Sequence, residues 1–144
     1  MHIETVIEIA APVDTVWSVL TEVESWPQWT ASVTRLELLD SGPLRPGSRA
    51  RIHQPRLPVA VWTITELTPG VAFTWISRAL GVTVTGIHAL APVTETVTAA
   101  RLVIDQRGPL ALPIGALTGS LARRYVAMEA RGLKTRSEQL TSGH

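Results

Sequence analysis

Short breaks of glycine, proline and serine recur along the middle of this chain and constrain its fold more than any other feature. From Val33 onward β-branched residues dominate, and the breaks divide this region into six short segments. The breaks are Ser41-Gly42-Pro43, Pro46-Gly47, Pro55 to Pro58, Pro69-Gly70, Gly81 and Ala91-Pro92. Because no helix-length stretch separates neighbouring segments, we expect six strands that pair antiparallel through successive hairpins.

The N-terminal region carries a strand pattern followed by a helix pattern. Polar and apolar residues roughly alternate from His2 to Ala10, which predicts a half-buried first strand. Ala11-Pro12 ends the alternation, and a short amphipathic helix is expected to follow, with Val13, Val16, Trp17 and Leu20 at helical spacing. The stretch from Glu22 to Trp29 is interrupted by Pro27, so we expect only one or two further helical turns there.

After Gly108-Pro109 the apolar period becomes that of a helix. The apolar stripe comprises Leu110, Ile114, Leu117, Leu121, Tyr125, Met128 and Gly132. This predicts one long amphipathic helix whose basic opposite face is solvated. Gly115 and Gly119 weaken its start by roughly 1 kcal/mol each relative to alanine. Residues 109–119 therefore either open as a lid or use the glycines to approach the sheet closely.

One strand, two short helices, six strands and one long helix form an α+β order in which the last helix covers one sheet face. A strongly twisted sheet of this size curls around such a helix instead of lying flat, and the short helices close the remaining gap. We expect a single domain over residues 1–144: a curved seven-stranded antiparallel sheet around a long C-terminal helix, with an internal cavity.

Positive and negative side chains nearly balance, with 13 Lys+Arg against 12 Asp+Glu. No field of one sign is therefore expected that would attract nucleic acid or an anionic membrane. No stretch approaches the ~20 apolar residues that cross a bilayer, and the N-terminus lacks a signal-peptide pattern. We expect a cytoplasmic protein, a monomer or homodimer, with no nucleic-acid partner and no stable membrane insertion.

The residue types restrict the available chemistry. Cysteine is absent, which removes disulfides, thiolate catalysis and the usual zinc sites. The sequence contains no P-loop, dinucleotide fingerprint, nucleophile elbow or His-Glu-x-x-His helix. Its four histidines are scattered along the chain. We therefore expect no metal and no cofactor.

Counting with a period of two assigns strand residues to the cavity side. His88 shares the more apolar face of its strand, and two of the five tryptophans, Trp62 and Trp75, have inward parity. A mostly apolar lining with a few polar groups is typical of a small-molecule site. The candidate ligand-binding residues are Trp26, Trp29, Ile52, Gln54, Trp62, Ile64, Phe73, Trp75, Val84, His88, Leu102, Leu117, Leu121, Tyr125 and Met128.

Several short motifs occur in a characteristic order. They are Ile9-Ala10-Ala11-Pro12, Val16-Trp17, Trp26-Pro27-Gln28-Trp29, Gly47, Gln54-Pro55, Trp62, Pro69-Gly70, Phe73, Trp75, His88 and Gly108-Pro109-Leu110. This order resembles the START-like superfamily (SRPBCC), specifically its bacterial polyketide cyclase/dehydrase and lipid-transport branch, over almost the whole chain. The resemblance implies the helix-grip fold with a ligand cavity between sheet and C-terminal helix. It implies no single activity, because the superfamily includes cyclases, lipid carriers and receptors.

His88 and Tyr125 are the candidate catalytic residues. A histidine on an apolar strand face costs free energy unless it is hydrogen-bonded, and it can transfer protons near neutral pH. Each residue also has a structural interpretation: His88 as a satisfied core side chain, and Tyr125 as an anchor between helix and sheet. The same holds for the tryptophans, which could simply fill a solid interior.

Three functions remain open on the sequence. The first is a carrier or sensor that binds a small hydrophobic molecule, such as an aromatic, polyketide or lipid-like compound. The second is a cyclase/dehydrase-like enzyme in which His88 and Tyr125 assist proton transfer while the cavity folds a reactive chain. The third is a structural or interaction domain with a solid core.

Overall fold

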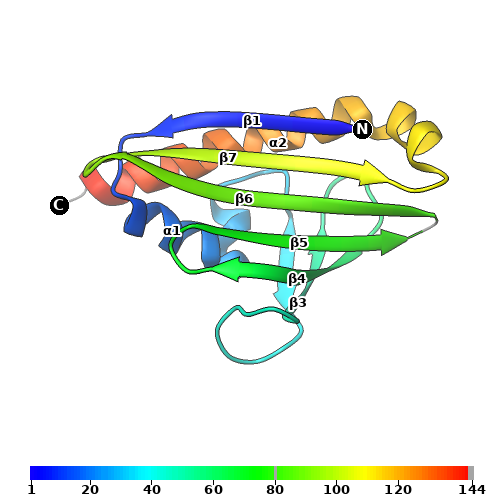
Figure 1. Cartoon of the computed structure of the whole chain (residues 1–144), viewed down its shortest axis with the longest axis horizontal. Helices are drawn as coiled ribbons and strands as arrows, with labels where there is room; N and C mark the ends of the chain where they lie inside the picture. Colours follow the sequence, from blue (N-terminus) through cyan, green and yellow to red (C-terminus); the bar gives the residue numbers. More distant parts are fainter. Residues whose placement is uncertain (80, 143–144) are drawn as a thin grey trace.

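A computed structural model describes residues 1–79 and 81–142, in which a seven-stranded antiparallel sheet covers one long helix (Figure 1). This confirms the predicted α+β helix-grip architecture. The single domain over residues 1–144 stays a prediction, and residues 80, 143 and 144 lie outside the described part. The elements are β1 (His2–Ile9), α1 (Val13–Thr21), η1 (Val23–Gln28), β2 (Arg35–Leu38), β3 (Arg49–His53), β4 (Ala60–Thr68), β5 (Ala72–Ala79), β6 (Val82–Thr94), β7 (Val97–Arg107) and α2 (Ala111–Ser142).

The strand order is β1-β7-β6-β5-β4-β3-β2, with every neighbouring pair antiparallel. The six later strands therefore form the expected meander of hairpins. β1 lies on the far side of β7, in a register that runs from His2 opposite Asp105 to Ile9 opposite Thr98. The first and last strands of the chain are thus neighbours in the sheet. The helix that follows β7 runs back along one face of the sheet.

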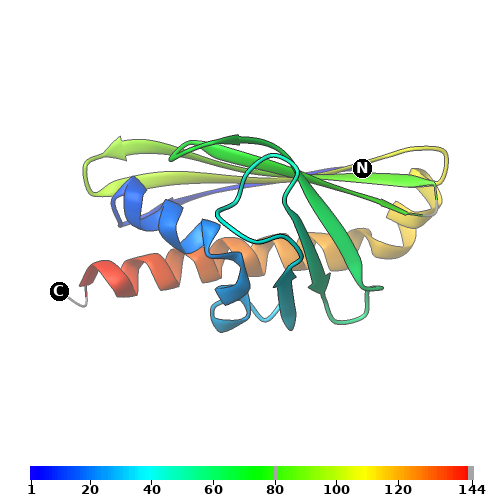
Figure 2. The same cartoon turned by 90° about the horizontal axis from the view of Figure 1, so that it is seen from below.

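α2 runs beneath the sheet for most of its length, α1 lies between the sheet and the C-terminal half of α2, and η1 continues from α1 away from the sheet (Figure 2). α2 approaches the end of η1 closely at Gly132. A Cβ atom added there would lie 2.0 Å from the carbonyl oxygen of Trp29, which follows η1. Glycine at this position therefore lets the helix cross the end of η1 at backbone contact.

The core gathers where α1 and η1 meet the sheet. Its fully buried side chains include Val16 and Leu20 of α1, Phe73 of β5 and Leu133 of α2. A smaller cluster joins β1 and β7 to the middle of α2 through Ile3, Leu102, Val126 and Ala130. The middle and C-terminal half of α2 are thus held by packed core, whereas residues 111–121 belong to neither cluster.

The buried face of α2 differs from the predicted leucine stripe. The buried residues of this helix are Ala111, Gly119, Tyr125, Val126, Ala130, Leu133 and Ser137. Small residues let α2 approach β1: the sulfur of Met1 lies 3.2 Å from where a Cβ atom of Gly119 would be. This contact corresponds to the close-approach interpretation of the two glycines, and the lid stays a prediction. The rotation of the helix turns Leu117 outward, where it is 86% exposed.

Candidate functional site

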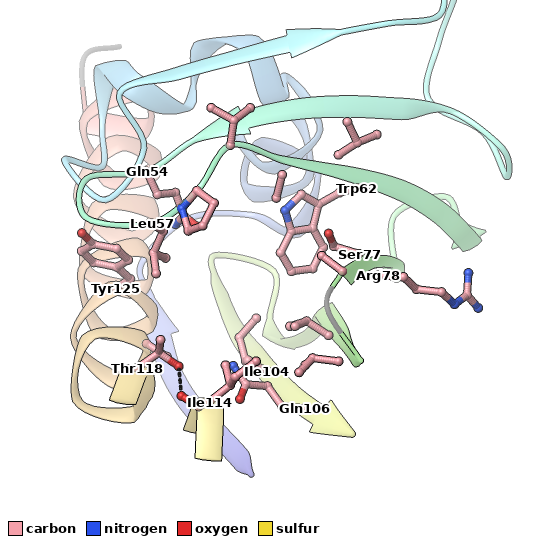
Figure 3. Close-up of a pocket in the computed structure, with 18 of the residues that line it drawn as sticks. Gln54, Leu57, Trp62, Ser77, Arg78, Ile104, Gln106, Ile114, Thr118 and Tyr125 are labelled. Atoms are coloured by element: carbon pink, nitrogen blue, oxygen red, sulfur yellow. Dashed lines mark hydrogen bonds between the residues drawn. The ribbon is translucent and has the colours of Figure 1, made fainter. Parts of the chain in front are cut away.

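A cavity of about 470 Å³ lies between the N-terminal half of α2 and strands β4 to β7 (Figure 3). Its volume is within the range of roughly 300–1,000 Å³ that is typical of small-molecule sites. Most of its wall is apolar and includes Leu57, Trp62, Val84, Ile104, Ile114 and Val126. The polar side chains in the wall are Gln54, Ser77, Arg78, Gln106, Thr118, Tyr125 and Glu129. This composition suits an apolar molecule with a few polar groups.

An aromatic cluster fills the other half of the interior, toward α1 and η1. The imidazole of His88 stacks on Phe73 with ring centroids 4.4 Å apart and 15° between planes. The rings of Trp26 and Trp75 lie 5.5 Å and 5.4 Å from the same imidazole. Because these rings occupy the space that a ligand would need, the interior is solid on this side.

Trp62 lies at the boundary between the solid and hollow halves. Its ring centroid is 5.8 Å from that of Trp75, and its own side chain forms part of the cavity wall. Gly86 of β6 leaves room for both indoles: an added Cβ atom would lie 2.9 Å from Trp75 and 3.6 Å from Trp62. Trp62 therefore forms the inner wall of the cavity.

One acidic side chain of the cavity wall is connected to the aromatic cluster. Nε2 of His88 lies 3.1 Å from Oε1 of Glu129, and Glu129 also lines the cavity. When Glu129 is ionised, Nε2 of His88 must carry the hydrogen and donate it. The hydrogen bond from His88 therefore fixes the orientation of the Glu129 side chain. The carboxylate of Glu129 can accept a hydrogen bond or a proton from a molecule in the cavity.

Tyr125 connects α2 to the loop between β3 and β4. Its hydroxyl group donates a hydrogen bond to the carbonyl oxygen of Pro55. The next residue, Arg56, has a φ of 66°, in the left-handed region that non-glycine residues rarely adopt. The same loop contributes Leu57 and Pro58 to the cavity wall. Tyr125 therefore closes the cavity wall on this side.

The structure brings four of the predicted site residues together around the cavity: Gln54, Trp62, Val84 and Tyr125. The other predicted residues lie elsewhere. The aromatic cluster and the main core contain Trp26, Trp29, Ile52, Ile64, Phe73, Trp75 and His88. Leu102 belongs to the smaller core cluster, Leu121 and Met128 are half-buried outside the wall, and Leu117 points to solvent.

Sequence reasoning missed several residues of the wall, most importantly Glu129 and Gln106. Glu129 follows Tyr125 by four residues, so the two share a helix face, and this spacing is the signal that could have identified it. Gln106 lies two residues beyond Ile104 on the inward parity of β7. Acidic and amide side chains normally indicate solvated positions, which is why the pattern did not single them out.

The carboxyl groups with shifted pKa values lie away from the cavity wall. The guanidinium of Arg49 lowers the pKa of Asp40, and that of Arg107 lowers the pKa of Asp105. Lys134, together with the backbone N–H of Ala10, lowers the pKa of Glu138. These are surface ion pairs, which contribute little to stability.

Two kinds of feature are absent from the described residues. No group of three or more His, Asp or Glu side chains in residues 1–79 and 81–142 is arranged to hold a metal ion. Within the same ranges, no helix has both the length and the apolar character needed to span a bilayer.

Comparison with known proteins agrees with this architecture. The family model for polyketide cyclase/dehydrase and lipid transport proteins matches residues 1–138. No relative was found among curated proteins.

Among solved structures, the Zhui aromatase/cyclase from Streptomyces sp. R1128 superposes with a TM-score of 0.79 at 19% identity, covering 96% of this chain and 94% of that one. A START superfamily protein from Mycobacterium smegmatis gives a TM-score of 0.79 at 19% identity, over 96% and 98% of the two chains. The di-domain aromatase/cyclase BexL of the BE-7585A biosynthetic pathway gives a TM-score of 0.73 at 22% identity, over 98% of this chain and 47% of that one. At these identities the likeness establishes the fold alone.

Proposed function

This chain belongs to the polyketide cyclase/dehydrase and lipid transport family of the START-like superfamily, and we propose on that premise that it binds one small, largely apolar molecule in the cavity beside α2. The observation that carries the proposal is the cavity itself, about 470 Å³ of space with a mostly apolar wall. Burial of an apolar molecule there is favoured by about 25 cal/mol for each Å² removed from water.

The wall also supplies groups that would orient the molecule. Trp62 offers a flat aromatic surface, against which a planar ring can stack. The carboxylate of Glu129 accepts a hydrogen bond, so a hydroxyl group on the ligand is favoured at that position. An aromatic or polyketide molecule with hydroxyl groups satisfies both features, and a lipid-like chain satisfies only the apolar wall.

Tryptophan fluorescence tests this proposal. Titration with naphthol, a small aromatic probe, is expected to quench part of the fluorescence saturably, because Trp62 forms part of the cavity wall. The variant Trp62→Phe should lose most of this quenching. The matched variant Trp17→Phe should retain it, since Trp17 packs edge-on against Phe73 in the core. Equal quenching in the two variants, or none in the wild type, would contradict a site beside Trp62.

A second candidate function is a cyclase/dehydrase-like enzyme, and the contact between His88 and Glu129 favours it. In this function the carboxylate of Glu129 takes a proton from a methylene group between two carbonyls of a poly-β-ketone chain. The enolate carbon then attacks a second carbonyl of the folded chain, and the proton returns to the new alkoxide oxygen. His88 positions Glu129 through its Nε2 hydrogen bond, and Tyr125 holds the loop that shapes the cavity.

A further inference from the structure

The first turns of α2 are apolar on their outer side as well as on the side that lines the cavity. Ile114 belongs to the cavity wall. On the opposite side Leu112 and Leu117 are 85% and 86% exposed, and Pro113 and Ala116 between them are exposed as well. A helix segment that is apolar all round is normally buried. These four residues form an exposed apolar patch, called here the α2 outer face. A patch of this kind is typical of an interaction surface.

The charged residues of the segment that contains this face are all arginines. Residues 106–128 include Arg107, Arg123 and Arg124 and no Asp or Glu, although the whole chain holds 12 acidic residues. Arg107 is paired with Asp105 at 2.6 Å. Arg123 and Arg124 are exposed and form no ion pair with any residue in 1–79 or 81–142. A net charge near zero for the chain therefore coexists with a local cationic surface.

We propose that the α2 outer face docks on an anionic lipid bilayer. Leu112 and Leu117 enter the boundary between head groups and acyl chains, and Arg123 and Arg124 lie against anionic head groups. The charge favours an anionic bilayer over a second copy of the chain as the occupant, because a second copy carries the same unpaired arginines beside the same face and offers them no opposite charge there. This is peripheral docking and requires no membrane-spanning segment.

Docking would bring the cavity to the lipid surface. Ile114 and Thr118 of the same turns lie beside the cavity in Figure 3, and Thr118 is held by a hydrogen bond from its hydroxyl to the carbonyl of Ile114. The segment that meets the bilayer on one side thus forms the cavity wall on the other. The inference does not depend on the proposed ligand, since vesicle binding needs no molecule in the cavity.

Flotation with vesicles tests the proposal. The full chain is expected to float with vesicles of phosphatidylcholine and phosphatidylglycerol in equal parts and to stay unbound with pure phosphatidylcholine. The double variant Leu112→Ser/Leu117→Ser should bind the anionic vesicles at least tenfold more weakly, because two apolar side chains no longer enter the bilayer. Arg124→Glu should also weaken binding, and high salt should release part of the wild type.

Matched variants on the same helix are the controls. Leu140→Ser removes an exposed leucine, and Arg131→Glu reverses an exposed arginine, both far from the α2 outer face. Both should bind like the wild type, and circular dichroism should show all four variants folded. A wild type that does not float with anionic vesicles overturns the proposal, as does equal loss in Leu140→Ser. Concentration-dependent dimerisation that the double leucine variant abolishes, without vesicle binding, would assign the surface to a second copy instead.

Discussion

Gly132→Ala is expected to lower the free energy of unfolding by about 3 kcal/mol, the upper part of the range for overpacked sites. The added methyl group would lie 2.0 Å from the carbonyl oxygen of Trp29, a backbone atom that cannot turn aside as a side chain can. Alanine favours a helix over glycine by about 1 kcal/mol, which offsets only part of the clash. To relieve it, α2 must move away from η1, and the core around Leu133 must open.

Gly115→Ala on the same helix is the matched control. Its methyl group would be 3.5 Å from the amide oxygen of Gln106 and 3.6 Å from Met1, both ordinary contacts. Only the gain in helix propensity then remains, so the free energy of unfolding should rise by up to about 1 kcal/mol. Urea denaturation of the three proteins measures both effects. If the two variants have the same stability, α2 does not cross η1 at Gly132.

Glu129→Gln is expected to reduce turnover of a linear poly-β-ketone about 100-fold or more if the protein is a cyclase, the usual loss when a proton-transferring group is removed. The amide keeps the shape of the side chain and can still meet His88, but it cannot accept a proton. Affinity for the unreactive naphthol probe should change little. The measurement is product formation under single-turnover conditions, beside a fluorescence titration.

Glu138→Gln provides the control, because Glu138 is a carboxylate of the same helix that pairs with Lys134 outside the cavity wall. It should turn over substrate like the wild type. Equal rates for Glu129→Gln and the wild type would remove the proposed acid–base role. A wild type that binds the ketone and releases it unchanged would identify the protein as a carrier.

The sequence predicted the sheet and the long helix because their signals are local. Alternation from His2 to Ala10 and the glycine and proline breaks after Val33 determine where strands begin and end. Chain order then leaves few ways to pair them. The helix after Gly108-Pro109 was equally clear, since apolar residues recur at helical spacing from Leu110 to Met128, over more than half of α2.

The division of the interior into a packed aromatic cluster and a cavity could not be predicted in the same way. Period-two counting placed Trp62, Trp75 and His88 on one side of the sheet, and all three do face the interior. It gives no information on which inward side chains meet, so it could not show that Trp75 and His88 pack with Trp26 while Trp62 borders open space. That outcome depends on side-chain volumes and on Gly86, which makes room for the indoles.

The orientation of α2 depended on the same kind of packing. The leucine stripe predicted Leu117 and Leu121 toward the sheet, but Gly119, Val126 and Ala130 give a closer fit to β1 and β7. Hydrophobicity alone ranks leucine first, whereas close packing of a helix on a sheet favours small side chains where backbones approach. The outward leucines and the inward Glu129 both follow from this rotation.

The central claim is that the space beside the N-terminal half of α2 holds a ligand, and native mass spectrometry of protein recovered from its own host tests it most directly. The wild type should carry one bound small molecule. Thr118→Phe, whose ring would enter the cavity, should carry none, and Ser120→Phe on the exposed side of α2 should carry the same molecule as the wild type. A molecule retained equally by all three proteins, or none in the wild type even after incubation with naphthol, would contradict the claim.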